Sequence, residues 1–305
     1  MRILITGATG FVGVALAKKL LNAGHELHIL TRNSGNVPEV FKNSKVTVFE
    51  WRDTKTSPPK ECIQGINGVI NLMGENISAK RWSAEQKIKL HESRVESTKN
   101  LTALLDQHLD SQLDFFVSSS AVGIYPVNSP EIFNEESKLG NNFLAKLCND
   151  WEAAAYTLKK VKRTVIIRTA VVLEKNGGAL AKMLPPFKLG LGGPIGDGNQ
   201  FMSWIYLNDL VNLFVTAATD SSYTGVYNGV SPHPVENFHF TKALGNALHR
   251  PTLFPVPVIA LKVAFGEMSS VILDSQKVVS KNLKDKNFEF ECETIESAFK
   301  KIFGN

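Results

Sequence analysis

The sequence predicts an α/β protein with a doubly wound parallel sheet and a small, mainly helical C-terminal lobe. Three observations support this fold class. Apolar runs alternate with helical patterns up to about residue 172, the runs are almost continuously apolar, and a glycine-rich turn follows the first of them. Continuous apolar runs are typical of strands buried on both faces, and right-handed crossovers then place helices on both sides of a parallel sheet.

The strands and helices of the first part follow directly from this alternation. Helical spacing of apolar residues and runs of β-branched residues separate the two kinds of element. Strands are predicted at 2–6, 25–31, 45–51, 68–74, 113–121 and 163–172, and helices at 11–22, 82–109 and 143–160. Ser83 is the expected N-cap of the long helix, with Gln86 three residues later.

The character of the chain changes after residue 172. The stretch 174–200 is dense in glycine and proline, and we expect a partly helical lid or substrate loop there, with an ordinary mobile surface loop as the alternative. A strand and a helix follow from residue 201, with Asn208 or Asp209 at the helix start, and then a short strand at 223–230. Helices are predicted at 235–248, 257–266 and 294–303. We therefore expect one domain over 1–230 and a small C-terminal domain over 231–305 that closes a cleft.

Composition excludes several classes of function. The chain has 305 residues, is 43% hydrophobic and 21% charged, and its net charge of +5 is scattered, so neither nucleic acid nor a membrane is an expected partner. No stretch of about twenty apolar residues occurs, and glycines interrupt the apolar N-terminal run, so we expect no membrane span and no secretory signal.

The cysteines and histidines indicate neither disulfide bonds nor a metal site. Three distant cysteines suggest no disulfide framework, and the seven histidines lack ligand spacing. We expect no metal site and a reducing, cytoplasmic location.

The segment "GATGFVG" lies directly between the first strand and the first helix. Gly7 allows a tight turn, Gly10 lets the backbone approach a phosphate, and Gly13 lets the helix pack close to the strand. The helix N-terminus then offers amides and a positive dipole end to a pyrophosphate. The turn therefore predicts a dinucleotide site, the alternative being a glycine turn that only packs.

The end of the second strand indicates which dinucleotide would bind. An acidic residue there would hydrogen-bond a ribose 2′-hydroxyl and select NAD, but this chain has Thr31 and Arg32. A guanidinium forks onto phosphate oxygens, so the position favours the 2′-phosphate of NADP(H). A solvated surface arginine is the alternative.

In these and other motifs the chain resembles the short-chain dehydrogenase/reductase superfamily, in its extended or atypical branch. The motifs are "GATGFVG", "NLMGEN" and "FVSSSAVGIYP". The longer segments "FLAKLCNDWEAAA", "GLGGPIGDGNQFMSWI" and "RPTLFPVPVIALKVAFGEM" resemble an NADP-binding, epimerase-like group that carries a small C-terminal domain of unknown function. This resemblance spans essentially the whole chain and implies a Rossmann-type domain with bound dinucleotide.

The resemblance also implies the positions of the site residues. The pyrophosphate would lie against Gly7, Thr9, Gly10, Phe11, Val12 and Gly13, and the adenosine end against Thr31 and Arg32. The ribose next to the nicotinamide would lie near Leu72, Met73, Gly74 and Glu75. Arg81 follows in the same loop and is expected either to reach a phosphate or to lie at the surface.

The chain departs from the superfamily at the catalytic pair, a tyrosine and a lysine four residues later. With Glu152 as the anchor, these two positions hold Leu144 and Cys148, which supply neither the proton nor the fixed positive charge. Ser120 matches the superfamily serine, and Tyr125 is the nearest phenol that would replace the missing acid unless it packs or faces solvent. Cys148 is expected to be a core thiol.

The sequence leaves two candidate functions open. The first is an NADP-dependent oxidoreductase or epimerase-like protein acting on a small polar substrate, with Ser120 orienting an oxygen and Tyr125 or water handling the proton. The second is a module that binds NADP(H), or senses its redox state, without turnover. The helix 82–109 is also a candidate face for a homodimer.

Overall fold

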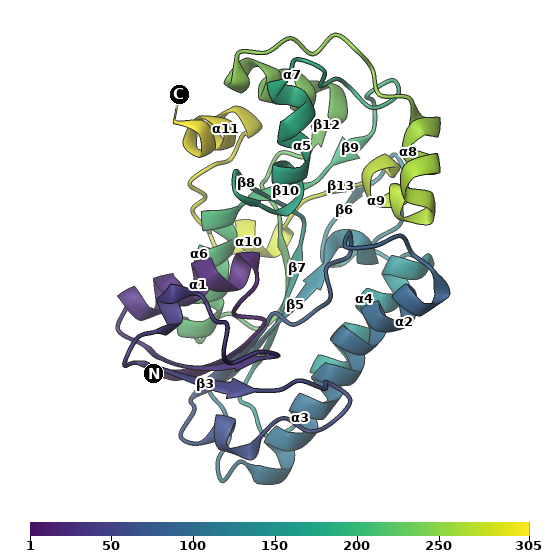
Figure 1. Ribbon diagram of the computed structural model, residues 1–305. Helices are drawn as coiled ribbons and strands as arrows, with labels where there is room; N and C mark the ends of the chain where they lie inside the picture. Colours follow the sequence, from purple (N-terminus) through teal and green to yellow (C-terminus); the bar gives the residue numbers. More distant parts are fainter. Residues whose placement is uncertain (305) are drawn as a thin grey trace.

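Seven parallel strands form the central sheet in a computed structural model that describes residues 1–304 (Figure 1). Their order is β11-β7-β5-β4-β1-β2-β3, so the predicted doubly wound α/β fold is confirmed. The chain first winds from β1 toward β3 and then returns to place β4 on the other side of β1, which makes the β1/β4 boundary the switch point of the topology. The strands are β1 (Arg2–Thr6), β2 (Glu26–Thr31), β3 (Val46–Glu50), β4 (Gly68–Asn71), β5 (Phe115–Ala121), β7 (Thr164–Thr169) and β11 (Gly225–Gly229).

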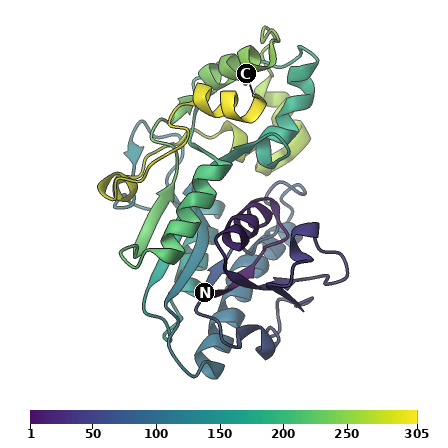
Figure 2. The ribbon, with the colours of Figure 1, turned by 90° about the vertical axis from the view of Figure 1, so that its left-hand side faces the viewer.

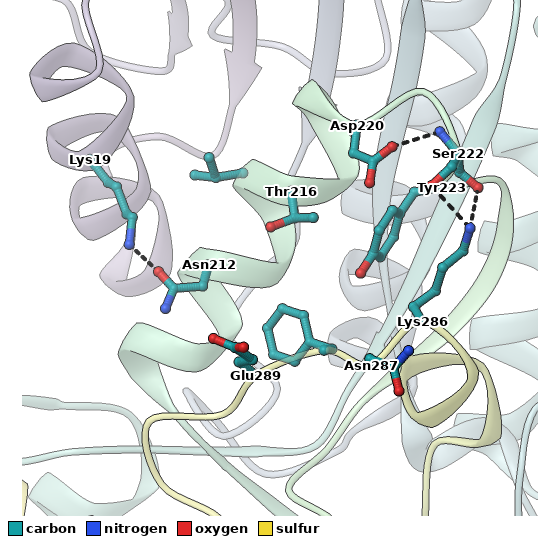
Figure 3. A pocket seen from close by; sticks show the side chains of 11 residues that line it. Lys19, Asn212, Thr216, Asp220, Ser222, Tyr223, Lys286, Asn287 and Glu289 are labelled. Atoms are coloured by element: carbon teal, nitrogen blue, oxygen red, sulfur yellow. Dashed lines mark hydrogen bonds between the residues drawn. The ribbon is translucent and has the colours of Figure 1, made fainter.

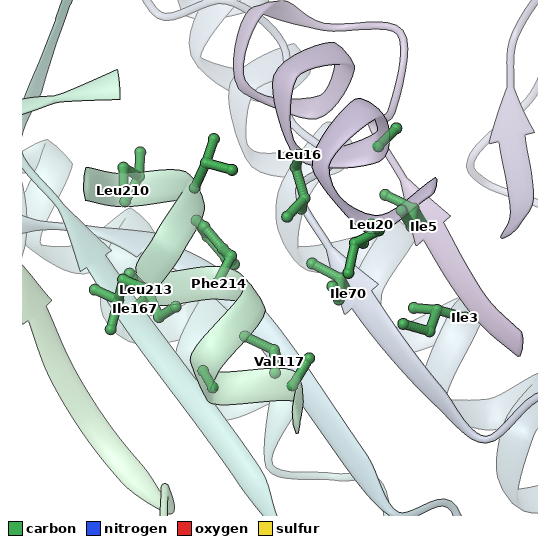
Figure 4. Close-up of a cluster of buried hydrophobic side chains, with 14 of the residues drawn as sticks. Ile3, Ile5, Leu16, Leu20, Ile70, Val117, Ile167, Leu210, Leu213 and Phe214 are labelled. Atoms are coloured by element: carbon green, nitrogen blue, oxygen red, sulfur yellow. The ribbon is translucent and has the colours of Figure 1, made fainter. Parts of the chain in front are cut away.

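Helices cover both faces of the sheet. On one face lie α1 (Phe11–Asn22) and α6 (Leu207–Thr219), and on the other lie α3 (Ser97–His108) and α4 (Phe143–Ala155) (Figures 1 and 2). Figure 4 shows how Leu16 and Leu20 of α1 and Phe214 of α6 meet the apolar side chains of the strands. Burial of this apolar surface is the main source of the sheet's stability.

The predicted helix 82–109 is present but contains a wider segment. α2 (Ala84–His91) continues through a π-helical turn (Glu92–Glu96) into α3. The Ser83 hydroxyl caps α2 by accepting a hydrogen bond from the Gln86 amide at 3.2 Å, as its position in the sequence predicts. Single π turns often occur at functional sites, and this one lies next to the loop that follows β4.

One predicted strand is in fact two. The run 163–172 divides at Ala170, where the chain leaves the central sheet, and β8 (Val171–Glu174) pairs with β10 (Trp204–Tyr206) in a separate ribbon. Both pieces are largely buried, so the hydrophobic pattern does not mark the break between them.

The C-terminal lobe combines two distant parts of the chain. Its core packs α5 (Gly178–Lys188), α7 (Asn237–Leu248) and α11 (Ile295–Phe303) around the fully buried Trp204. The segment 174–200 is partly helical, as predicted, through α5, and residues 231–304 share their core with side chains of residues 171–206. Beside this core stand α8 (Val258–Phe265) and α9 (Ser270–Leu273) (Figure 1).

Short elements complete the fold. They are β6 (Ile132–Phe133) paired with β13 (Lys277–Val278), β9 (Phe201–Met202) paired with β12 (Val235–Glu236), α10 (Lys281–Asp285), and the helical turns η1 (Glu39–Phe41), η2 (Lys60–Ile63), η4 (Val122–Ile124) and η5 (Gly266–Ser269). A helix long and apolar enough to cross a membrane does not occur among residues 1–304.

Candidate functional site

The glycine-rich turn links β1 to α1 at the switch point of the sheet. Gly7 has φ +66°, and a Cβ there would lie 2.7 Å from the Leu72 carbonyl oxygen. A Cβ on Gly13 would lie 2.3 Å from the Gly7 carbonyl oxygen, so only glycine lets α1 pack this close to the turn. The tight-turn role of Gly7 and the packing role of Gly13 thus follow from contacts within the chain.

Gly10 differs from the other two glycines. Its φ of −79° suits any residue, and the single atom near a Cβ built there is the Gly7 carbonyl oxygen at 3.2 Å. The missing side chain therefore leaves open space in front of the N-terminus of α1. No side chain caps this N-terminus and no acidic residue stands in the first turn, so the amides of Phe11, Val12 and Gly13 suit an anion.

The side chains of Thr9 and Phe11, in the same turn, lie in different surroundings. Thr9 is exposed, whereas the ring of Phe11 packs on Gly177 at the start of α5, where a Cβ would come within 2.2 Å of the ring. The contact places the beginning of the 174–200 segment against the first turn of α1.

A buried polar network holds the strand ends beneath the turn. Thr6 donates to the Asn71 carbonyl oxygen at 2.6 Å, and the Asn71 amide donates to Thr98 at 3.0 Å and to Ser118 at 3.1 Å. These contacts tie β1, β4 and β5 to α3 at the switch point. The sequence analysis does not single out Asn71, although a polar residue at the end of an otherwise apolar run is a signal for it.

The loop Leu72–Glu75 crosses the same edge of the sheet. The Leu72 amide donates to Thr6, and the guanidinium of Arg94 lies 3.0 Å from the position of a Cβ on Gly74. Arg94 donates to the Glu75 carbonyl oxygen at 2.8 Å and stacks on Trp151, while burial lowers its pKa. Arg94 thus supports the loop that carries Glu75, and the sequence analysis misses it because it lies in the middle of a long helix.

Thr31 and Arg32 stand at the end of β2. The backbone amide of Trp51, directly after β3, donates to the Thr31 carbonyl oxygen at 2.7 Å. The Arg32 side chain is 77% exposed and pairs with Glu75 at 3.7 Å, so it is accessible to a phosphate. Arg81, by contrast, lies at the surface against Gly266 at the end of α8, and no contact joins it to Glu75.

Ser120 and Tyr125 belong to one buried network. The Ser120 hydroxyl donates to Glu152 at 2.6 Å, and Arg168 forms two hydrogen bonds of 2.8 Å with the same carboxylate. Arg168 also donates to the Tyr125 hydroxyl, which in turn donates to Asn228, both at 2.8 Å. Ser120 is 3% exposed and Tyr125 is fully buried, which favours the packing role for Tyr125.

The two positions of the missing pair lie beside this network. Leu144 packs against Gly123. Cys148, which also belongs to α4, is buried beside the end of β5. Burial, with the Glu152 carboxylate as a second cause, raises the pKa of the Cys148 thiol to about 12. The thiol is therefore neutral and buried, as expected of a core cysteine.

Two hollows lie away from the glycine turn. One, of about 860 Å³, separates the segment 195–200 from α8 and α9, and its polar lining includes Asn128, Gln200, Lys262 and Ser269. The other, of about 530 Å³, lies between the last turn of α1, α6 and the segment after α10 (Figure 3). Lys19, on its rim, is about 13 Å along α1 from Gly10. No three His, Cys, Asp or Glu side chains gather as a metal site within residues 1–304.

Known proteins share this architecture over the full chain. The model of the NAD dependent epimerase/dehydratase family matches residues 3–228, and that of a domain of unknown function, DUF1731, matches residues 256–302. The chloroplastic epimerase family protein SDR39U1 homolog of Arabidopsis thaliana is 39% identical over 305 residues, which cover 99% of this chain and 86% of the relative. The epimerase family protein SDR39U1 of Bos taurus is 34% identical over 307 residues and 99% of both chains.

A solved structure extends the likeness to three dimensions. The crystal structure of human epimerase family protein SDR39U1 (isoform 2) with NADPH has a TM-score of 0.88 and 31% identity, and it covers 100% of both chains. The resemblance drawn from the sequence motifs is thereby confirmed. This chain belongs to the NAD dependent epimerase/dehydratase family, with a C-terminal DUF1731 segment.

Proposed function

We propose that the chain binds NADP(H) at the switch point of its sheet and acts as an oxidoreductase or epimerase-like protein on a small polar substrate. The observation that carries the proposal is the uncapped N-terminus of α1, with open space where Gly10 lacks a side chain. The human SDR39U1 structure with NADPH supports this choice of cofactor.

The proposal assigns roles to the residues around the glycine turn. The amides of Phe11, Val12 and Gly13 hold the pyrophosphate, with Gly7, Thr9 and Gly10 forming the turn before them. Thr31 and Arg32 meet the adenosine end, and the exposed guanidinium of Arg32 takes the 2′-phosphate. Leu72, Met73, Gly74 and Glu75 lie along the ribose next to the nicotinamide.

The bound cofactor would supply a hydride donor or acceptor at the nicotinamide C4. The Ser120 hydroxyl donates its hydrogen bond to Glu152, so its oxygen is left to accept a hydrogen bond from a substrate hydroxyl. The hydroxyl of Tyr125 is occupied by Arg168 and Asn228, which supports water rather than Tyr125 as the proton carrier. The hollow beside the segment 195–200, with its polar lining, suits a small polar substrate.

A second candidate is a module that binds NADP(H) without turnover. The observation that favours it is the pair Leu144 and Cys148, two apolar groups at the positions where the superfamily places its acid and its lysine. The low exposure of Ser120 points the same way.

Fluorescence titration with NADPH tests cofactor binding, with Gly10→Ala as the diagnostic variant. A methyl group at this position enters the open space in front of the N-terminus of α1, so the variant should bind NADPH at least about tenfold more weakly, a loss of about 1.4 kcal/mol. Alanine is compatible with φ −79°, so unfolding stability should fall by only about 1 kcal/mol, as for an N-cap glycine. Equal NADPH affinity in both proteins would contradict the proposed site.

A panel of carbonyl compounds and sugar nucleotides then separates the two candidates. Consumption of NADPH with any member of the panel supports the enzyme. Tight binding of NADPH without consumption across the panel supports the module.

A further inference from the structure

The ion pair between Arg32 and Glu75 crosses the switch point of the sheet. Arg32 follows β2 directly, and Glu75 stands in the loop after β4. In the sheet β1 lies between these two strands, which places β2 and β4 about 10 Å apart. The contact of 3.7 Å from Arg32 Nη1 to Glu75 Oε2 therefore spans the end of β1, where the glycine turn begins.

The backbone of Glu75 is held on both sides. Its amide donates to the Ser93 hydroxyl at 2.9 Å, and its carbonyl oxygen accepts from Arg94 at 2.8 Å. Both partners belong to the π-helical turn Glu92–Glu96. The carboxylate thus projects from an anchored backbone, and its side chain is 30% exposed, whereas the paired Arg32 side chain is 77% exposed and is the freer of the two.

We propose that Glu75 is a specificity-determining residue, whose carboxylate competes with the cofactor 2′-phosphate for the guanidinium of Arg32. This inference rests on the proposed binding of NADP(H) at the switch point of the sheet. A phosphate offers more charge and more acceptor oxygens than a carboxylate, so it displaces Glu75 from Arg32. The 2′-hydroxyl of NAD(H) carries no charge and leaves the pair in place. Glu75 therefore sets how far the site prefers NADP(H) over NAD(H).

Glutamine at position 75 tests the competition, because it keeps the size of the side chain and removes its charge. An exposed ion pair contributes little, so Glu75→Gln should raise the affinity for NADPH about two- to fivefold relative to the affinity for NADH at low salt. The gain should disappear at about 1 M salt, where the screening length falls to about 3 Å. Fluorescence titrations with NADPH and with NADH give both affinities.

Two further variants isolate the pair. In an Arg32→Gln background, Glu75→Gln should no longer change the affinity for NADPH, because the guanidinium for which the carboxylate competes is gone. Glu39→Gln is the matched control, since it removes one exposed carboxylate that pairs with Lys42 instead, and it should leave both affinities unchanged.

The outcomes distinguish a failure of the proposed function from a failure of the role inferred for Glu75. Wild-type protein that binds neither coenzyme overturns the proposed function, and the inference with it. Wild-type protein that binds NADPH, combined with a Glu75→Gln variant that shifts NADPH and NADH equally or weakens NADPH, overturns the inference alone. An unchanged gain in the Arg32→Gln background also overturns it.

Discussion

Arg168 and Glu152 form a bidentate ion pair inside the protein, with two nitrogen–oxygen distances of 2.8 Å. Their side chains are only 6% and 9% exposed. Ser120 donates to the same carboxylate, and the Tyr125 hydroxyl accepts from the same guanidinium. Each buried charge is thus compensated by a partner and by further hydrogen bonds, which is the condition under which a buried pair is tolerated.

Removing one partner of this pair should strongly destabilise the protein. Glu152→Met leaves the Arg168 charge buried without its carboxylate, at an expected cost of about 3–5 kcal/mol in the free energy of unfolding. Urea unfolding measures this loss. The double variant with Arg168→Met should recover most of it, and Glu26→Gln, which breaks the exposed pair with Arg2, should cost less than about 1 kcal/mol. A Glu152→Met variant as stable as Glu26→Gln would contradict the structural role of the pair.

Tyr125→Phe distinguishes a packing tyrosine from a catalytic one. Burial raises the pKa of Tyr125, and the variant loses the hydrogen bonds to Arg168 and Asn228, so unfolding stability should fall by about 1–3 kcal/mol. Its affinity for NADPH should not change. Abolished turnover at unchanged stability would instead identify Tyr125 as the acid.

Asp209 should make stability depend on pH. Its carboxylate is fully buried and accepts from the amides of Glu291 at 2.6 Å and Cys292 at 3.1 Å. Burial raises its pKa from 3.8 to about 6, which means that the folded state holds this proton more tightly than the unfolded state. The resulting stability is complete below about pH 4 and is lost as the pH rises through about 6.

Denaturant unfolding of wild-type and Asp209→Asn protein from pH 4 to pH 7 measures this effect. The wild type should lose up to about 3 kcal/mol relative to the variant over this range. Parallel pH curves for the two proteins would show that Asp209 does not titrate in this way.

Arg32→Asp should reverse the preference between coenzymes. Loss of charge-assisted hydrogen bonds to the 2′-phosphate should weaken NADPH binding by about ten- to one hundredfold, while NADH should change far less. Titration of the variant with both coenzymes gives the two affinities. An equal loss for NADPH and NADH would remove the case for a 2′-phosphate at this position.

The sequence by itself determined the order of the elements and the glycine turn. Strand and helix periods are local properties, so β1, α1 and β2 begin and end within about two residues of their predicted bounds. Gly7 and Ser83 are equally local signals, one for a positive φ and one for a helix cap. The family resemblance follows from the same short motifs.

The tertiary structure alone decided the contacts between distant residues. Asp209 stands in the first turn of α6, as predicted, yet its carboxylate binds amides more than 80 residues later along the chain. Trp204 lies fully buried in the core of the C-terminal lobe, among helices that are far apart in the chain. Arg94 meets the Glu75 backbone because the helix α2–α3 packs against the loop after β4. No periodic pattern in the sequence predicts these long-range contacts, because they depend on how whole elements pack and not on the spacing of neighbouring residues.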